Sequence, residues 1–148
     1  MTTQEVKEYF KQIRKEQSEL MHLIEMRRRE ELSLLPKGIT YDGDRVQSTP
    51  EDTLSKTAAK IVDIQQEIDS SILGLRQRKA EAESYISKLE CSNEREVMRW
   101  YYMDNDCGKL LSWQQVAEKM GYTEKHVLKL HGTALLNLSK ELKKDDTK

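Results

Sequence analysis

Apolar residues recur at helical spacing along most of the chain, and Pro or Gly breaks the pattern at only a few places. Neither residue occurs between Thr3 and about Leu35, where the apolar stripe comprises Val6, Phe10, Ile13, Leu20, Ile24 and Leu34. This spacing predicts one helix of about 30 residues, roughly 45 Å long at 1.5 Å per residue. The stripe is interrupted by Gln17, Arg27 and Glu31.

Three consecutive arginines, Arg27 to Arg29, lie in this first helix beside glutamates at positions 25, 30 and 31. Charge runs on helices usually form a solvated face with pairs three or four residues apart, and we expect that arrangement here. A contact with phosphate is the alternative.

A second long helix is predicted to begin at Pro50. The segment from Pro36 to Ser48 is rich in turn residues and predicts a connecting loop, and Thr49 and Pro50 form an N-cap and a first helical position. Apolar residues then recur every seven positions, at Leu54, Ile61, Ile68, Leu75, Ala82 and Leu89, with Ala58, Ile72 and Ile86 four residues after three of them. This heptad pattern predicts a coiled-coil seam over about 39 residues.

Two long helices with a loop between them predict an antiparallel helical hairpin over residues 1–90. Such a hairpin buries little on its own, so we expect it to pair with a second copy as a homodimer or a higher oligomer. A pair of hairpins would form a four-helix bundle, and the sequence leaves the direction of pairing open.

A C-terminal module is predicted over residues 91–148, and it begins with a helix from Asn93 to about Met103. Asn93 and Glu96 have the spacing of a capping pair, while the apolar side of the helix carries Val97, Trp100 and Tyr101, which we expect to form a core. Residues 104–108 are interpreted as a turn rather than a calcium loop, because the Gly and Glu that such a loop requires are missing.

The stretch from Ser112 to His131 predicts two short helices joined by a tight turn. Ser112 and Gln115 have capping-box spacing, Gly121 supplies a left-handed residue that ends the first helix, and Thr123 is a good N-cap for the second. Val127 and Leu130 are expected to face back toward the first helix, where Val116, Ala117 and Met120 share one side. This is the pattern of a helix-turn-helix.

The second of these helices is predicted to be a recognition helix over residues 123–138, with Ala134, Leu135 and Leu138 continuing its apolar stripe and a fraying polar end after it. Its exposed positions could enter the major groove of DNA. The candidate DNA-binding residues are Ser112, Gln114, Lys119, Thr123, Glu124, Lys125, His126 and Lys129.

Composition narrows the functional class. The 148 residues are 34% charged and 36% hydrophobic with a net charge of -1, which fits an all-α protein and argues against a histone-like binder. There is no Gly-rich phosphate loop, nucleophile elbow or metal-binding helix signature, so we expect neither an enzyme nor a cofactor or metal site. Two separate cysteines and no apolar run of membrane-spanning length predict a cytoplasmic protein without membrane contact.

Two sequence stretches carry a resemblance to known families. EREVMRWYY followed by SWQQVAEKMGYTEKHVLKLHGTALLNL resembles region four of bacterial sigma factors. With YDGDRVQS at positions 41–48 and the long helix after it, nearly the whole chain is similar to ArpU-type transcriptional regulators, small phage and prophage proteins. The resemblance implies that residues 123–129 meet DNA, although Glu124 and Lys125 invert the charges that sigma factors usually carry there.

Two hypotheses of function follow. The first is a sequence-specific DNA-binding transcriptional regulator of phage or prophage genes that binds double-stranded DNA through residues 123–138. The second is a coiled-coil adaptor whose helix-turn-helix docks RNA polymerase or a phage DNA-packaging component, a hypothesis favoured by the exposed position expected for Leu128.

Overall fold

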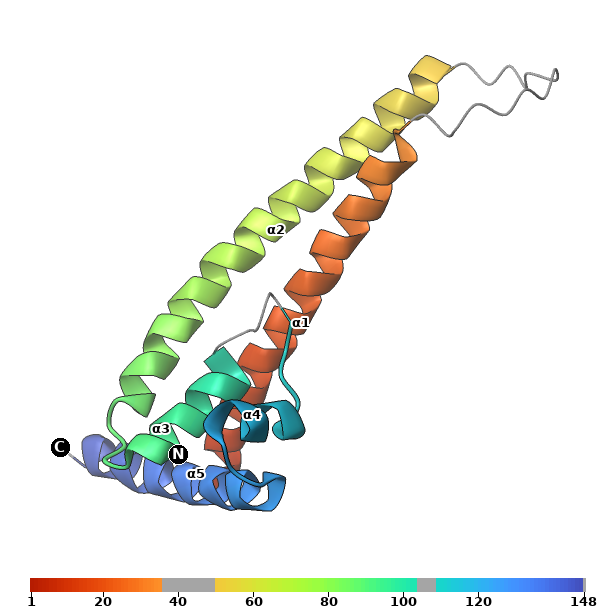
Figure 1. Ribbon diagram of the computed structural model, residues 1–148. Helices are drawn as coiled ribbons and strands as arrows, with labels where there is room; N and C mark the ends of the chain where they lie inside the picture. Colours follow the sequence, from red (N-terminus) through yellow and green to blue (C-terminus); the bar gives the residue numbers. More distant parts are fainter. Residues whose placement is uncertain (36–49, 104–108, 148) are drawn as a thin grey trace. The chain divides into compact units, whose positions relative to one another are not determined.

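The computed structural model describes residues 1–35, 50–103 and 109–147, and the side chains of residues 50–52 lie outside this description. The described chain forms only helices: α1 (Thr3–Ser33), α2 (Pro50–Ile86), α3 (Ser92–Met98), the π-helical turn η1 (Arg99–Met103), α4 (Trp113–Met120) and α5 (Glu124–Asp146) (Figure 1). The prediction of an all-α protein is confirmed. The predicted loop at 36–48, the N-cap at Thr49 and the turn at 104–108 lie outside the described residues.

The chain forms two compact units, one comprising residues 1–18 and 74–148 and the other residues 19–73. The boundaries between them fall inside α1 and α2. A division into domains at residue 90 therefore stays a prediction, and each unit is described by itself.

The first unit pairs the beginning of α1 with the end of α2. The rings of Tyr9 and Tyr85 lie 5.5 Å apart, and Arg78 Nη1 lies 3.0 Å from Glu16 Oε1. As the residue number increases along α1, from 9 to 16, the number of its partner on α2 decreases, from 85 to 78, so these segments run antiparallel. The predicted helix pair is present, while its packing as a coiled coil stays a prediction.

The stripe on the first four turns of α1 is buried, as its helical spacing predicts. Val6, Phe10 and Ile13 are at most 1% exposed, and the ring of Phe10 lies 5.3 Å from that of Tyr102. Gln17, which appeared to interrupt the stripe, is also buried, with its Nε2 donating a hydrogen bond to the Tyr102 carbonyl. The buried part of the stripe therefore continues through Gln17, because a backbone acceptor satisfies the amide nitrogen. Further along the predicted stripe, Ile24 and Leu34 are 40% and 37% exposed.

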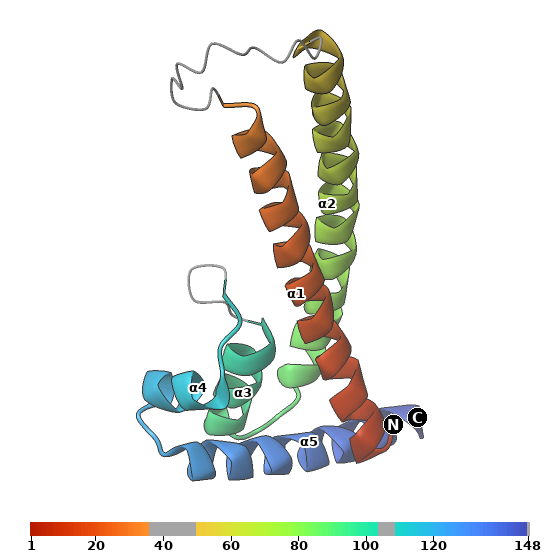
Figure 2. The same ribbon diagram turned by 90° about the vertical axis from the view of Figure 1, so that its right-hand side faces the viewer.

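The short helices of the first unit pack around one apolar cluster. It is formed by Val97, Leu111, Val116, Ala117 and Val127, with Trp100, Tyr101, Trp113, Met120 and Leu130 against it. Both α3 and α4 lie against α5 (Figure 2). The core residues predicted for a helix from Asn93 to about Met103, which the structure divides into α3 and η1, and the predicted inward side of α4 are therefore confirmed.

Two local predictions are wrong. The N-cap of α3 is Cys91, with no side-chain cap, so Asn93 and Glu96 lie inside the helix and form no capping pair. The expected fraying end is part of α5, which continues to Asp146 because Ser139 and Leu142 are buried there. Ser139 Oγ donates to the Met1 carbonyl at 2.8 Å, so contacts from the start of the chain stabilise these last turns.

The second unit, residues 19–73, contains parts of α1 and α2. Its helices are joined by a hydrogen bond from Arg27 to the Gln65 side chain. The predicted pairing of the arginine cluster within its own helix is confirmed, since Arg28 and Arg29 lie 3.8 Å and 3.7 Å from Glu25 and Arg27 lies 3.5 Å from Glu31.

Candidate nucleic-acid interface

The connection between α4 and α5 is fixed by three local elements that the sequence predicts. Ser112 Oγ accepts from the Gln115 amide at 3.3 Å, and the Gln115 side chain accepts from the Ser112 amide at 2.9 Å, which completes the capping box. Gly121 has φ 74°, a left-handed conformation that costs a glycine little. Thr123 Oγ1 accepts from the His126 amide at 3.2 Å and caps α5.

Tertiary packing then fixes how α5 is rotated. Val127 is fully buried in the apolar cluster and Leu130 packs against it. Because side chains three and four residues apart share a side of a helix, the opposite side of the first turns of α5 must face outward. Lys125, Leu128 and Lys129 are all exposed there.

The eight sequence-predicted site residues are all exposed: Ser112, Gln114, Lys119, Thr123, Glu124, Lys125, His126 and Lys129. They differ in what they can still bind. The hydroxyls of Ser112 and Thr123 already accept capping hydrogen bonds, and the His126 ring lies 4.8 Å from that of Tyr122. Lys125 and Lys129 are four residues apart and lie one above the other on one face of the helix.

Two further features of this face were not included in the predicted site. Leu128 is 43% exposed although it is a large apolar residue, and it stands between Lys125 and Lys129. Gly132, one turn after Leu128, is also exposed, and a Cβ built there would meet nothing within 4 Å. The exposure of Leu128 could be foreseen from helical spacing, but a list restricted to polar residues left it out.

Lys7 and Lys11 of α1 add positive charge beside α5. Burial is the main cause that lowers the pKa of His131 to about 4, and the charges of these two lysines lower it further. Phe10, which lies between them in the sequence, packs on Tyr102, and Tyr102 contacts His131, so this part of α1 lies close to α5. Their spacing of four is visible in the sequence, but nothing local relates α1 to α5, so only tertiary structure brings them together.

Arg14 connects α1 to the polypeptide on both sides of residues 104–108. Its Nη1 and Nη2 each donate a 2.7 Å hydrogen bond, one to the carbonyl of Tyr101 and one to that of Leu111. Its guanidinium carbon lies 3.8 Å from the centroid of the Tyr101 ring, and the Trp113 ring stacks on that ring at 3.6 Å. Arg14 thus holds the end of η1 and the start of α4 to one helix.

Tyr102 and His131 form a polar pair inside the first unit. Tyr102 Oη and His131 Nε2 lie 2.7 Å apart, and the two residues are 1% and 8% exposed. Burial raises the pKa of Tyr102 and lowers that of His131, so both are neutral near pH 7. His131 is therefore a packed histidine rather than a candidate ligand of DNA.

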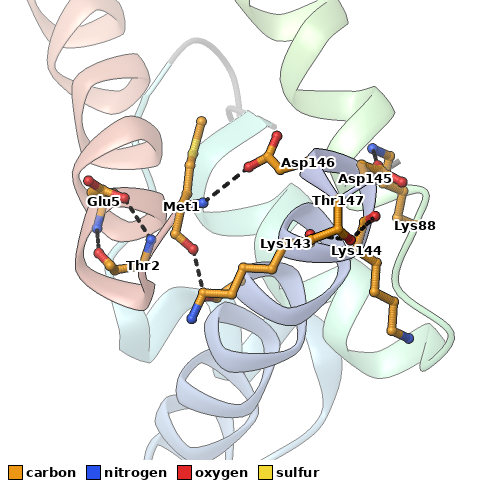
Figure 3. Close-up of polar contacts among 10 residues, drawn as sticks. Met1, Thr2, Glu5, Lys88, Lys143, Lys144, Asp145, Asp146 and Thr147 are labelled. Atoms are coloured by element: carbon orange, nitrogen blue, oxygen red, sulfur yellow. Dashed lines mark hydrogen bonds and ion pairs between the residues drawn. The ribbon is translucent and has the colours of Figure 1, made fainter.

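The last turns of α5 are tied to two other segments (Figure 3). The Met1 amino group lies 3.7 Å from Asp146 Oδ2, and Lys88 pairs with Asp145. A groove of about 730 Å³ lies beside them and includes Glu94, a 5% exposed carboxylate that accepts from Asn137 at 3.0 Å. Lysines and glutamates both line the groove, so it shows no selective charge.

The chemistry available at the outward face of α4 and α5 is donation and acceptance of hydrogen bonds by exposed side chains. Among the described residues, no group of three or more His, Cys, Asp or Glu side chains could hold a metal ion. In the same ranges, none of the helices is both long and apolar enough to cross a membrane.

The chain matches no family model, no curated protein and no solved structure.

Proposed function

We propose that this protein is a sequence-specific DNA-binding transcriptional regulator of phage or prophage genes. Residues 113–146 would act as a helix-turn-helix whose recognition helix, residues 123–138, enters the major groove of double-stranded DNA. One observation carries the proposal: two capped helices meet at the left-handed Gly121, and the buried Val127 turns Lys125 and Lys129 outward. This is the arrangement by which a helix presents side chains to base edges.

The exposed side chains suit base readout. Lysine donates to the O6 and N7 acceptors of guanine, and a glutamate such as Glu124 can accept from the amino group of cytosine. Exposed Glu124, Lys125 and Lys129 therefore favour a site that contains G·C pairs. Their charges are inverted at positions 124 and 125 relative to most sigma factors, so the target would differ from a sigma promoter element.

Phosphate contacts would come from a wider surface. Lys7 and Lys11 on α1 add cationic groups beside α5, and the capped N-terminus of α4 adds backbone amides, which bind phosphate oxygens well. Because the whole chain has a net charge of -1, bulk attraction to DNA is weak and these local charges carry the association. Affinity should therefore fall steeply as salt is raised.

The resemblance to sigma region four and to ArpU-type regulators supports the phage or prophage assignment. It rests on the sequence from Glu94 to Leu138 and on the segment at 41–48. A helix-turn-helix in such a protein is expected to read DNA directly, with RNA polymerase as a further partner.

The proposal is tested by selecting fragments of host and phage genomic DNA with the purified full chain. An enriched motif is expected, and Lys125→Ala with Lys129→Ala should abolish its binding while the far-ultraviolet circular dichroism stays unchanged. Lys56→Ala with Lys60→Ala is the matched control, because it removes two exposed α2 lysines at the same spacing of four. The assignment is wrong if the recognition-helix variant binds the motif as well as the wild type.

A second function, a protein-docking adaptor, is favoured by one observation. Leu128 and Leu136 are 43% and 47% exposed on α5 and lie eight residues apart, on neighbouring parts of its surface. Exposed leucines of this kind are suited to binding the surface of a partner protein, for instance RNA polymerase or a DNA-packaging component. An unbiased DNA selection that enriches nothing, together with a partner that binds wild type but not Leu136→Glu, would favour the adaptor.

A further inference from the structure

The second unit has almost no core of its own. Among its described residues, 19–35 and 53–73, Ile68 is the only one that is buried, at 2% exposure. The same residues include many large apolar side chains that stay partly or fully exposed: Leu20, Met21, Leu23, Ile24, Met26, Leu32, Leu34, Leu35, Leu54, Ile61, Val62, Ile64, Ile72 and Leu73. An apolar surface this rich usually marks an interaction site.

The most exposed of these side chains come from both helices. Leu32 in the last turn of α1 and Leu35 just after that helix are 52% and 58% exposed, and Leu54, Val62 and Leu73 on α2 are 53%, 55% and 61% exposed. Ile61 and Ile68 of the heptad row are less exposed than these residues. The exposed apolar surface of α2 therefore combines the start of that row, at Leu54, with a neighbouring strip that contains Val62 and Leu73.

The charges around this surface favour a neutral partner over a nucleic acid or an anionic membrane. Arg28 and Arg29 are paired with Glu25, and Arg27 lies between Glu31 and the Gln65 amide oxygen. On this part of α2 the two lysines, Lys56 and Lys60, are outnumbered by one by the acids Asp63, Glu67 and Asp69. A second copy of the chain has the same apolar surface and the same weakly charged rim.

The size of the surface also fits a second copy. The parts of α1 and α2 in this unit, residues 19–33 and 50–73, are about 22 Å and 36 Å long. Two helices side by side are about 20 Å wide, so the face measures on the order of 600 Å² in projection. A standard interface buries about 800 Å² of accessible surface per partner, and a projected face understates accessible surface.

We propose that two copies of this chain associate through the apolar face formed by residues 19–35 and 53–73 and form a four-helix arrangement. Each copy covers the exposed leucines and valine of the other, which is the self-complementary contact of a two-fold dimer. The inference stands on the apolar exposure of this unit and does not depend on DNA binding.

The test measures the mass of the full chain by sedimentation equilibrium at about 1–100 μM, a range chosen to bracket a micromolar dissociation constant. Wild type should have about twice the 17.4 kDa of one chain, and its melting temperature should rise with concentration, because association stabilises the folded state by mass action. Val62→Glu with Leu73→Glu should give a 17.4 kDa monomer with no concentration dependence of melting. Leu136→Glu, a similarly exposed leucine outside this unit, is the matched control and should remain a dimer.

Each other outcome overturns the proposal. A wild-type monomer throughout this range means that no second copy covers the face, and a mass of three or more chains excludes a pair. A double variant that remains dimeric, or a control that dissociates, places the interface elsewhere. If the double variant loses its helical circular dichroism, Leu32→Glu is used instead, because it places a charge on the same face from α1. The proposal then requires Leu32→Glu to be a folded monomer.

Discussion

Tyr102 Oη lies 2.7 Å from His131 Nε2, and this contact joins the π-helical turn before residue 104 to the middle of α5. Both side chains are buried, and the Tyr102 ring also packs on Phe10 of α1. Three segments far apart in sequence therefore meet at one polar pair. Because protonation of His131 would place a positive charge in this buried site, the pair makes the packing of α5 sensitive to acid.

Acid should destabilise the protein through His131. Its pKa is lowered to about 4, whereas an unfolded histidine has its ordinary pKa of about 6.5. Between these values the unfolded chain binds the extra proton, so stability is fully present above about pH 6.5 and falls as the pH approaches 4, by about 3 kcal/mol at most. The measurement is urea unfolding of wild type at several pH values.

His131→Gln removes the titrating group and keeps a side-chain oxygen that can accept from Tyr102. Its unfolding free energy should depend less on pH between 6.5 and 4 than that of wild type. His126→Gln is the control, because His126 is exposed and should leave the pH dependence unchanged. Equal pH dependence in wild type and His131→Gln would show that other groups cause the acid sensitivity.

Loss of Arg14 should loosen the attachment of α4 to α1. Arg14→Ala removes two charged hydrogen bonds and a contact with the Tyr101 ring, which should cost about 2–4 kcal/mol of unfolding free energy. Arg14→Lys should recover less than half of this, because an ammonium group lacks the forked geometry that reaches two carbonyls. Lys15→Ala, at the exposed neighbouring position, should change stability by less than about 0.5 kcal/mol.

What the sequence could predict is local. The capping box at Ser112, the left-handed Gly121 and the N-cap at Thr123 each depend on residues a few positions apart, and all three predictions are confirmed. The bounds of α1 followed in the same way from a stretch without Pro or Gly. The side of α5 that carries Val127 followed from helical periodicity.

What the sequence could not predict depends on contacts across the chain. Gln17 is polar, and nothing near it in sequence indicates that the Tyr102 carbonyl will accept from its amide. The last turns of α5 look like a fraying tail, yet Leu142 is buried and Ser139 bonds to Met1. At the candidate site, the sequence alone could not show that Lys7 and Lys11 lie beside α5, because tertiary packing brings α1 and α5 together.

Two glycines should respond to alanine in opposite directions. Gly121→Ala places a side chain in the left-handed region at φ 74° and should cost about 1–2 kcal/mol, although the space around the new Cβ is open. Gly132→Ala lies within α5, also with open space, and should stabilise the protein by up to about 1 kcal/mol. Thermal unfolding of both variants compares them directly, and destabilisation by Gly132→Ala would contradict the helical account of that position.

Leu128 should contribute to the choice of DNA sequence if α5 is a recognition helix. It is 43% exposed between Lys125 and Lys129, and an apolar side chain in the major groove can contact the 5-methyl group of thymine. Leu128→Ala should weaken binding to the selected DNA motif by about 1 kcal/mol, roughly fivefold in affinity. Fluorescence anisotropy at a fixed salt concentration measures the change.

Replacing single thymines of the motif by deoxyuridine separates this contact from a general loss of affinity, because only the methyl group is removed. Wild type should lose about fivefold at the contacted thymine, whereas Leu128→Ala should be indifferent to the same replacement, since one side of the pair is already missing. Leu136→Ala, two turns further along α5, should respond like wild type. If the effects of Leu128→Ala and of every deoxyuridine are additive, Leu128 touches no thymine methyl, and its exposure then favours contact with a protein.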